Sequence, residues 1–183
     1  MDPELLETVS LAMAQERSVT AVLQAIVDGL ACCRHTALAR IWLIAPGDIC
    51  AVCPMRAECP DRTRCLHLAV SRGNSLRPAG GDDRRIDGAF RRFPLGVRKI
   101  GRVAAGGQGI LIPDVRDARD WIARPDWAAA EGIVGFAAQP LVFRGETLGV
   151  LAIFRRTALG EPDFRRLRAF ADHAAVALAN ARA

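Results

Sequence analysis

Apolar residues recur at helical spacing at both ends of the chain. The pattern predicts an N-terminal helix within residues 1–17 and a second helix after Ser18, whose hydroxyl group suits an N-cap. A C-terminal helix is predicted over residues 161–183, with Pro162 in its first turn. This last helix carries apolar residues at alternating spacings of three and four, as in a heptad repeat: Phe164, Leu167, Ala171, Ala174, Leu178 and Ala181. Such a stripe packs either on its own domain or on a second copy, and the pattern leaves both open.

Between these helices, apolar runs and alternating patterns predict strands. Residues 37–44 form an apolar run, and residues 66–71 alternate between apolar and polar side chains. Residues 135–143 and 147–154 are typical of a hairpin joined by a tight turn. In the second hairpin strand both alternating sets are apolar, so we expect both of its faces to be buried.

The middle of the chain predicts shorter elements. Ile86, Phe90 and Phe93 are spaced as on a short helix, and residues 99–105 predict another short helix. A strand over residues 109–115 and a helical connection over residues 117–132 follow. This order predicts one α+β domain over residues 1–183, in which a central antiparallel sheet is flanked by helices and the N- and C-terminal helices pack together.

Composition and charge exclude several classes of protein. The chain has 183 residues, of which 51% are hydrophobic, so it can bury the core of one domain. The net charge of +5 comes almost entirely from arginines spread along the chain, without the basic and aromatic stripe that nucleic-acid binding needs. No apolar run reaches the roughly 18 residues of a membrane span. The first residues lack the pattern of a signal peptide, so a cytoplasmic location is expected.

Several strings in the second half of the chain resemble those of one family. They are Arg92-Phe93-Pro94-Leu95-Gly96, Leu111-Ile112-Pro113-Asp114-Val115 and Arg144-Gly145-Glu146-Thr147-Leu148-Gly149. Together they resemble the GAF domains of bacterial signalling proteins, of the sensor-kinase or transcriptional-activator type. The resemblance extends over roughly residues 18–182.

The resemblance implies a regulatory domain with a ligand pocket between the sheet and the segments that cover it. Trp121 and Trp127 are candidates to line that pocket and bind a small molecule, with plain packing as the alternative. It also implies a homodimer formed through the outer helices. The output domain, a kinase, a cyclase or a transcriptional activator, is expected outside this chain.

Four of the six cysteines lie within sixteen residues, in a cysteine-rich insertion over residues 48–65. Cys50, Cys53, Cys59 and Cys65 follow the pattern C-x2-C-x5-C-x5-C, and thiolates at such spacings bind metals. The spacing favours an iron–sulfur cluster first and zinc second, with reversible thiol chemistry or no site as the third reading. Neighbouring arginines would offset the charge of the thiolates. His67 is a candidate fifth ligand, although its place on the polar side of its strand favours a solvated histidine.

These observations favour a sensory domain that is not an enzyme. Two alternatives stay open at this point. One is a thiol-based reductase of the free methionine sulfoxide type, because a branch of the GAF family reduces that compound with cysteines. The other is a dimerisation module in which zinc fixes the cysteine-rich loop.

Overall fold

A six-stranded antiparallel sheet forms the centre of the protein, as seen in a computed structural model that describes residues 2–15, 18–77, 83–118, 120 and 122–183. Its strands are β1 (Thr36–Pro46), β2 (Arg64–Gly73), β3 (Arg92–Pro94), β4 (Ile110–Ile112), β5 (Gly135–Phe143) and β6 (Glu146–Arg155). They lie in the order β3-β2-β1-β6-β5-β4, and every neighbouring pair is antiparallel. The predicted hairpin is β5 and β6.

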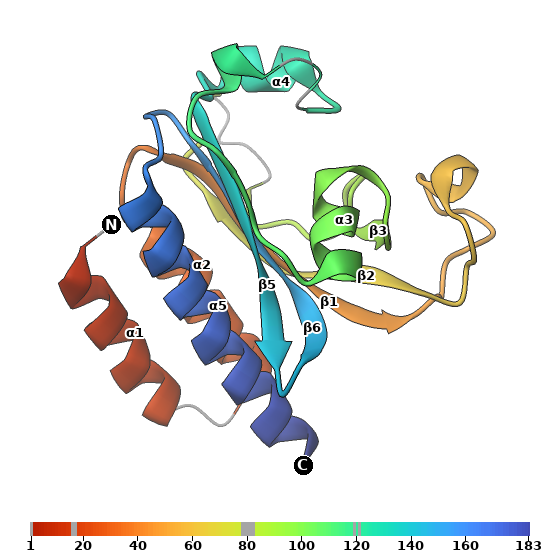
Figure 1. The fold of residues 1–183 in the computed structure, drawn as a ribbon, viewed down its shortest axis with the longest axis horizontal. Coiled ribbons are helices and arrows are strands. Elements are labelled where there is room, and N and C mark those ends of the chain that lie inside the picture. Colours follow the sequence, from red (N-terminus) through yellow and green to blue (C-terminus); the bar gives the residue numbers. More distant parts are fainter. Residues whose placement is uncertain (1, 16–17, 78–82, 119, 121) are drawn as a thin grey trace.

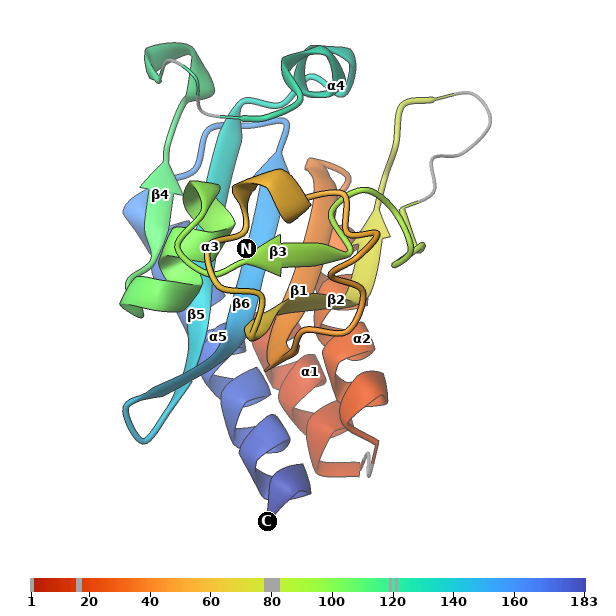
Figure 2. The same cartoon turned by 90° about the vertical axis from the view of Figure 1, so that its right-hand side faces the viewer.

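Helices cover both faces of this sheet (Figure 1). They are α1 (Pro3–Gln15), α2 (Val19–Ala31), α3 (Arg98–Gly106), α4 (Pro125–Ala130) and α5 (Glu161–Arg182), with short 3-10 helices at Arg56–Glu58 and Val115–Asp117. Helices α2 and α5 pack on one face with α1 outside them, while α3 packs on the opposite face, which Figure 2 shows from the front. The predicted α+β fold and the packing of the terminal helices against each other are therefore confirmed. None of the helices in the described ranges is both long and apolar enough to cross a membrane.

Strand β6 lies at the centre of the sheet and is buried on both faces, as predicted. Val150, Leu151 and Ala152 are fully buried, and their side chains belong to two separate apolar clusters, one on each face. The predicted N-cap of α2 is also present, since the Ser18 hydroxyl accepts a hydrogen bond from the Ala21 amide.

The heptad stripe of α5 packs within its own domain. Leu167, Ala171, Ala174 and Leu178 are at most 4% exposed and belong to the cluster between the sheet and α2. The sheet and α2 together cover a wider part of the α5 surface than the heptad stripe alone, so Phe170, which lies outside the stripe, is buried as well. Of the two alternatives, intradomain packing accounts for these side chains, and the stripe is not an open seam.

Two predictions for the middle of the chain are wrong. The segment around Phe90 and Phe93 is not helical, because β3 pairs with the edge of β2. The rings of Phe90 and Phe93 are nevertheless stacked, with their centroids 6.1 Å apart. Apolar residues three positions apart that meet in this way give the same sequence pattern as one face of a helix. Among the described residues of the connection over 117–132, the α-helix is limited to α4, because Pro125 fits the first turn of a helix and not its interior.

Gly101 in α3 permits a close approach between that helix and β3. A Cβ atom there would lie 2.2 Å from the carbonyl oxygen of Pro94. We expect Gly101→Ala to lower the free energy of unfolding by about 2 kcal/mol, because the helix and the strand must separate. Gly106→Ala, in the same helix with nothing within 4 Å of its Cβ, is the matched control. Urea denaturation measures both, and equal stability of the two variants would contradict this account of the contact.

Candidate functional site

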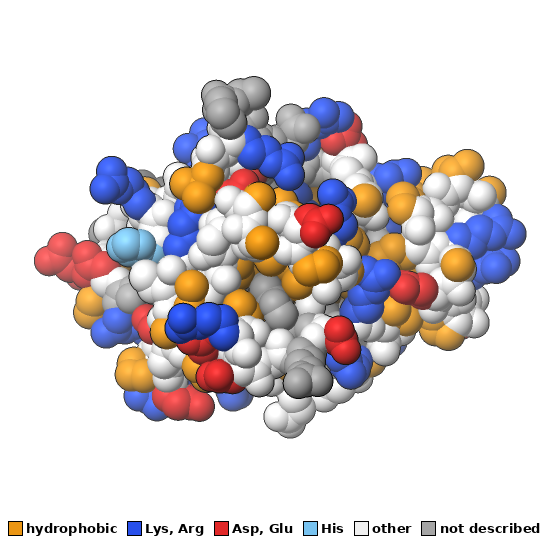
Figure 3. All heavy atoms as spheres, turned by 90° about the horizontal axis from the view of Figure 1, so that it is seen from above, with side chains coloured by type: hydrophobic (Ala, Val, Ile, Leu, Met, Phe, Trp, Pro, Cys, Tyr) orange, Lys and Arg blue, Asp and Glu red, His pale blue; other side chains and the backbone are white. Residues whose placement is uncertain are grey.

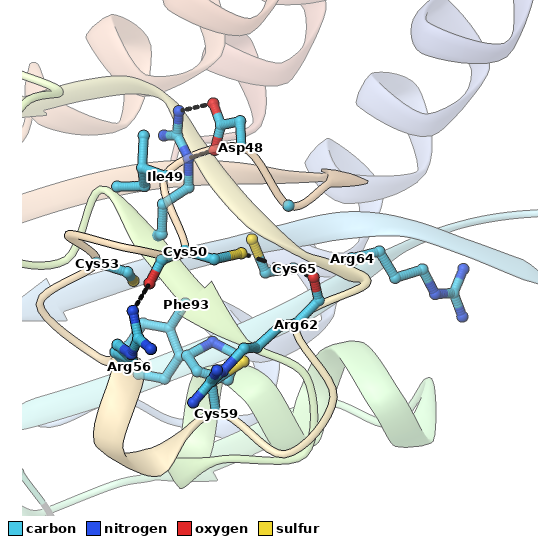
Figure 4. Close-up of a pocket in the computed structure, with 13 residues that line it drawn as sticks. Asp48, Ile49, Cys50, Cys53, Arg56, Cys59, Arg62, Arg64, Cys65 and Phe93 are labelled. Atoms are coloured by element: carbon cyan, nitrogen blue, oxygen red, sulfur yellow. Dashed lines mark hydrogen bonds and ion pairs between the residues drawn. The ribbon is translucent and has the colours of Figure 1, made fainter.

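The loop that joins β1 to β2 lies over the β3 edge of the sheet and encloses a hollow (Figure 4). All four cysteines of the predicted metal site line this hollow: Cys50, Cys53, Cys59 and Cys65. The first three come from the loop and Cys65 comes from β2. Their side chains are all half-buried, whereas Cys32 and Cys33 are not among the lining residues. The structure thus brings the four predicted ligands around one space.

Backbone contacts close the neck of the loop. The amide of Gly47 donates a hydrogen bond to the carbonyl oxygen of Thr63, at 2.9 Å. A side chain at Gly47 would not fit, because its Cβ would lie 2.8 Å from the Arg62 carbonyl oxygen and 3.0 Å from the Cys50 sulfur. Arg62 itself has a positive φ of 59°, which turns the chain back toward β2. This geometry brings Cys50 toward Cys65, and Figure 4 shows their sulfur atoms directed toward each other.

The remaining lining residues join the hollow to the apolar core. Cys53 packs against the cluster on the α3 face of the sheet, and Met55 is buried in it. Phe93 lines the hollow and also belongs to that cluster. On the outer side, Arg98 Nη2 lies 2.7 Å from Glu58 Oε1, which ties the loop to the first residue of α3.

The hollow is strongly basic. Arg56, Arg62, Arg64 and Arg92 all line it. Basic side chains gather at the end of the molecule that this loop forms, as the space-filling view from above shows (Figure 3). Positive charge on this wall would offset the negative charge that thiolate ligands of a bound metal carry.

One ion pair on the wall of the hollow has a fixed geometry. Arg92 donates two hydrogen bonds to Asp48, from Nε at 2.8 Å and from Nη2 at 2.7 Å. The Arg92 guanidinium holds the pKa of the Asp48 carboxyl well below its usual range, so this carboxylate stays charged. Sequence reasoning missed this pair, because its members are 44 positions apart and no local pattern joins them.

Burial raises the pKa of the Cys65 thiol to about 11, and the nearby Arg92 opposes that rise. At neutral pH, Cys65 is therefore protonated in the metal-free protein. A metal would have to displace this proton in order to bind the sulfur.

His67 has another partner and does not line the hollow. Its Nε2 atom lies 2.9 Å from the carbonyl oxygen of Pro46, and since a carbonyl oxygen only accepts, Nε2 carries the hydrogen. Burial lowers the pKa of this imidazole below its ordinary value. The structure gives His67 a role in joining β2 to the end of β1, and the alternative of a fifth ligand finds no support.

The four sulfurs do not converge on one point. Within the described residues, no group of three or more Cys, His, Asp or Glu side chains is arranged so that it could hold a metal ion as it stands. The space inside the hollow is about 20 Å³, which is room for about one water molecule. A single tetrahedral zinc, with zinc–sulfur distances of about 2.3 Å, would require the sulfurs to draw together.

Only one of the two predicted ligand-binding tryptophans can be placed. Trp127 packs edge-on against Phe154, with ring centroids 5.2 Å apart, in a small cluster with Ala128 and Ile133. Trp121 lies outside the described residues. Packing under α4 accounts for Trp127, and a small-molecule site there stays a prediction.

The family can be assigned by comparison with known proteins. The family described as GAF domain matches residues 16–179, which is most of the chain. The chain belongs to the GAF domain family. Among curated protein sequences, none matches it.

Solved structures of this GAF fold come from proteins with different activities. A GAF domain of a phosphoenolpyruvate-protein phosphotransferase from Coxiella burnetii is 18% identical, with a TM-score of 0.67 over 98% of this chain and 93% of its own. A free methionine-R-sulfoxide reductase from Neisseria meningitidis, solved with its substrate, is 19% identical, with a TM-score of 0.68 over 98% of this chain and 89% of its own. A fragment of a methyl-accepting chemotaxis protein is 21% identical, with a TM-score of 0.62 over 95% of this chain and 96% of its own. At these identities the likeness establishes the GAF fold alone.

Proposed function

We propose that this GAF domain is the sensory domain of a signal-transduction protein, and that its input is a metal centre held by Cys50, Cys53, Cys59 and Cys65. The observation that carries the proposal is the arrangement of all four thiols around one hollow with a basic wall. An iron–sulfur cluster is our first assignment and zinc the second. The domain has no catalytic role in this proposal.

The cysteine spacing supports a cluster over a single ion, because zinc sites favour two close pairs and only Cys50 and Cys53 form a close pair here. The arginines on the wall of the hollow would offset the negative charge that four thiolates bring.

The contacts of the loop suggest how the state of the centre would reach the rest of the domain. Glu58 ties the loop to Arg98 at the start of α3, and Met55 packs in the same apolar cluster as Ile100 and Val103 of that helix. Helix α3 in turn packs on β5 and β6, whose other face carries α5. Loss of the metal would loosen the loop and change the packing of α3.

Hydrogen–deuterium exchange tests this sensory role. We expect protein prepared without air to lose amide protection over residues 47–65 and in α3 when a chelator removes its metal. Helix α2, on the opposite face of the sheet from α3, should keep its amide protection and is the internal control. Equal exchange in the two samples would reject the cysteine loop as an input.

The reductase alternative is favoured by one observation, since enzymes that reduce free methionine sulfoxide share this fold. Such chemistry needs an exposed thiolate of low pKa, whereas burial raises the pKa of Cys65 to about 11. We therefore expect no turnover of free methionine sulfoxide in the presence of a dithiol reductant. Turnover that Cys65→Ser abolishes would establish the enzyme instead.

We also propose that the domain forms a homodimer through the outward sides of α1 and α5 and passes its signal to an output domain outside this chain. Val176 on α5 is 46% exposed, whereas Leu178 is buried and unsuitable as a probe. Val176→Glu should weaken dimerisation at least tenfold while folding is kept, because a charge enters an apolar contact. Val52→Glu, at a more exposed valine on the cysteine loop, is the control. Sedimentation velocity measures both, and a monomeric wild type at 100 μM, roughly the upper range for weak dimers, would reject the dimer.

A further inference from the structure

Two of the four cysteines that line the hollow form a pair apart from the others. The sulfur atoms of Cys50 and Cys65 are directed toward each other, whereas those of Cys53 and Cys59 lie away from this pair (Figure 4). Cys53 packs instead against the apolar cluster on the α3 face of the sheet. The hollow has room for about one water molecule, so its walls lie close together around the paired sulfurs.

The two paired sulfurs are carried by segments with fixed positions. Cys65 belongs to β2, which pairs with β1 on one side and with β3 on the other. Cys50 lies in the loop, and its Sγ donates to the carbonyl oxygen of Arg62 at 3.6 Å. Gly47 leaves room for this sulfur, because a Cβ there would lie 3.0 Å from it. The neck of the loop therefore holds the Cys50 sulfur beside the segment that leads into Cys65.

We propose that Cys50 and Cys65 form a reversible disulfide, with a small disulfide such as oxidised glutathione as the oxidant. Because Cys50 belongs to a loop, it can adjust to the geometry of an S–S bond while the sheet stays fixed. The bond is independent of the proposed metal centre. It needs no metal, and it excludes one because it withdraws two of the four proposed ligands.

The bond forms by two exchange steps. The Cys50 thiolate attacks one sulfur of oxidised glutathione, breaks its S–S bond and expels one glutathione thiolate, which leaves a mixed disulfide on Cys50. The Cys65 sulfur then attacks the Cys50 sulfur and expels the second glutathione. Two electrons pass from the two cysteines to the oxidant, and the two thiol protons end on the two glutathione molecules.

Position decides which cysteine reacts first. Cys50 lies on the outer loop, where the exposed Arg56 and Arg62 attract an anionic oxidant. Burial raises the pKa of the Cys65 thiol to about 11, so little thiolate is present there. Cys65 therefore takes the second step, in which the mixed disulfide beside it gives the high effective concentration of an intramolecular reaction.

Peptide mapping of the full chain tests this pair. Protein prepared without air is treated first with a chelator and then with oxidised glutathione, and its remaining thiols are alkylated. We expect most chains to contain a disulfide between the tryptic peptides 41–56 and 65–72, and a dithiol reductant to remove it.

Serine variants assign the bond to individual sulfurs. Cys53→Ser leaves Cys50 as the only cysteine of residues 41–56, and this variant should keep the cross-link although it loses the metal. Cys59→Ser should also keep the cross-link. Cys50→Ser and Cys65→Ser should each abolish it.

Three results would overturn the disulfide pair: no cross-link, a cross-link to the peptide 57–62 that carries Cys59, or glutathione that stays on Cys50 without the second step. The metal content of the same preparation, measured before the chelator is added, decides the proposed metal centre separately. Either proposal can therefore fail while the other stands.

Discussion

Replacing Cys53 by serine should reduce the metal bound by anaerobically prepared protein to less than a tenth of the wild-type content. A serine hydroxyl is a poor replacement for a soft, anionic thiolate, and Cys53 belongs to the close C-x2-C pair. Its side chain lines the hollow and packs against the apolar cluster on the α3 face of the sheet. Elemental analysis per chain measures the loss.

Cys32→Ser is the matched control for this experiment. Cys32 is exposed at the C-terminal end of α2 and is not one of the residues that line the hollow. It should therefore keep the full metal content. An equal loss in both variants, or full retention in Cys53→Ser, would show that the four cysteines do not act together.

The second large effect is expected at Glu131, which follows α4. This carboxylate is 3% exposed and accepts hydrogen bonds from Arg156 Nη2 at 2.7 Å, the Ser75 hydroxyl at 2.7 Å and the Leu76 amide at 3.0 Å. Arg156 also donates to the backbone carbonyls of Asn74 and Glu131. Glu131→Ala should lower the free energy of unfolding by about 3–5 kcal/mol, because it leaves a largely buried guanidinium without its carboxylate.

The pH dependence of this loss follows from the same contacts. Burial alone would raise the pKa of Glu131, but its hydrogen bonds outweigh burial and hold the pKa below its ordinary value. The carboxylate therefore stabilises the fold above the pKa of an unfolded glutamate, and this contribution disappears as the pH falls through the folded pKa. Guanidinium denaturation at pH 7 and near pH 4 should show a smaller difference between wild type and variant at the lower pH.

Glu7→Ala, at an exposed position of α1, is the control for the glutamate substitution. It should change the stability by less than about 0.5 kcal/mol at either pH. A loss below about 1 kcal/mol for Glu131→Ala at pH 7 would contradict the buried ion pair.

Much of the fold could be predicted from the sequence, because local rules and tertiary packing agree there. Ser18 caps α2 through its own hydroxyl, and both apolar sets of β6 are buried because that strand lies in the middle of the sheet. The four cysteines could also be grouped in advance, since a C-x2-C pair and two short gaps within one loop leave them little room to separate.

The rest depends on contacts between distant parts of the chain. Strand β3 forms because an edge of β2 is available for pairing. Its three residues are too few to show a periodic pattern of apolar and polar positions in the sequence. The Arg92–Asp48 and Arg156–Glu131 pairs join segments 44 and 25 residues apart, so no spacing rule finds them. The stripe on α5 has the same pattern for intradomain and intersubunit packing, and only the burial of Leu178 shows that the domain uses it.

The central claim is that the four cysteines hold one metal centre together. It is tested most directly by iron, zinc and acid-labile sulfide analysis of the wild-type protein prepared without air, read beside its visible absorption spectrum. The account predicts a brown protein in which iron and sulfide are present in equal amounts and at stoichiometric levels per chain, and from which air removes the colour. Protein prepared in this way with neither iron nor zinc at stoichiometric levels would contradict the account.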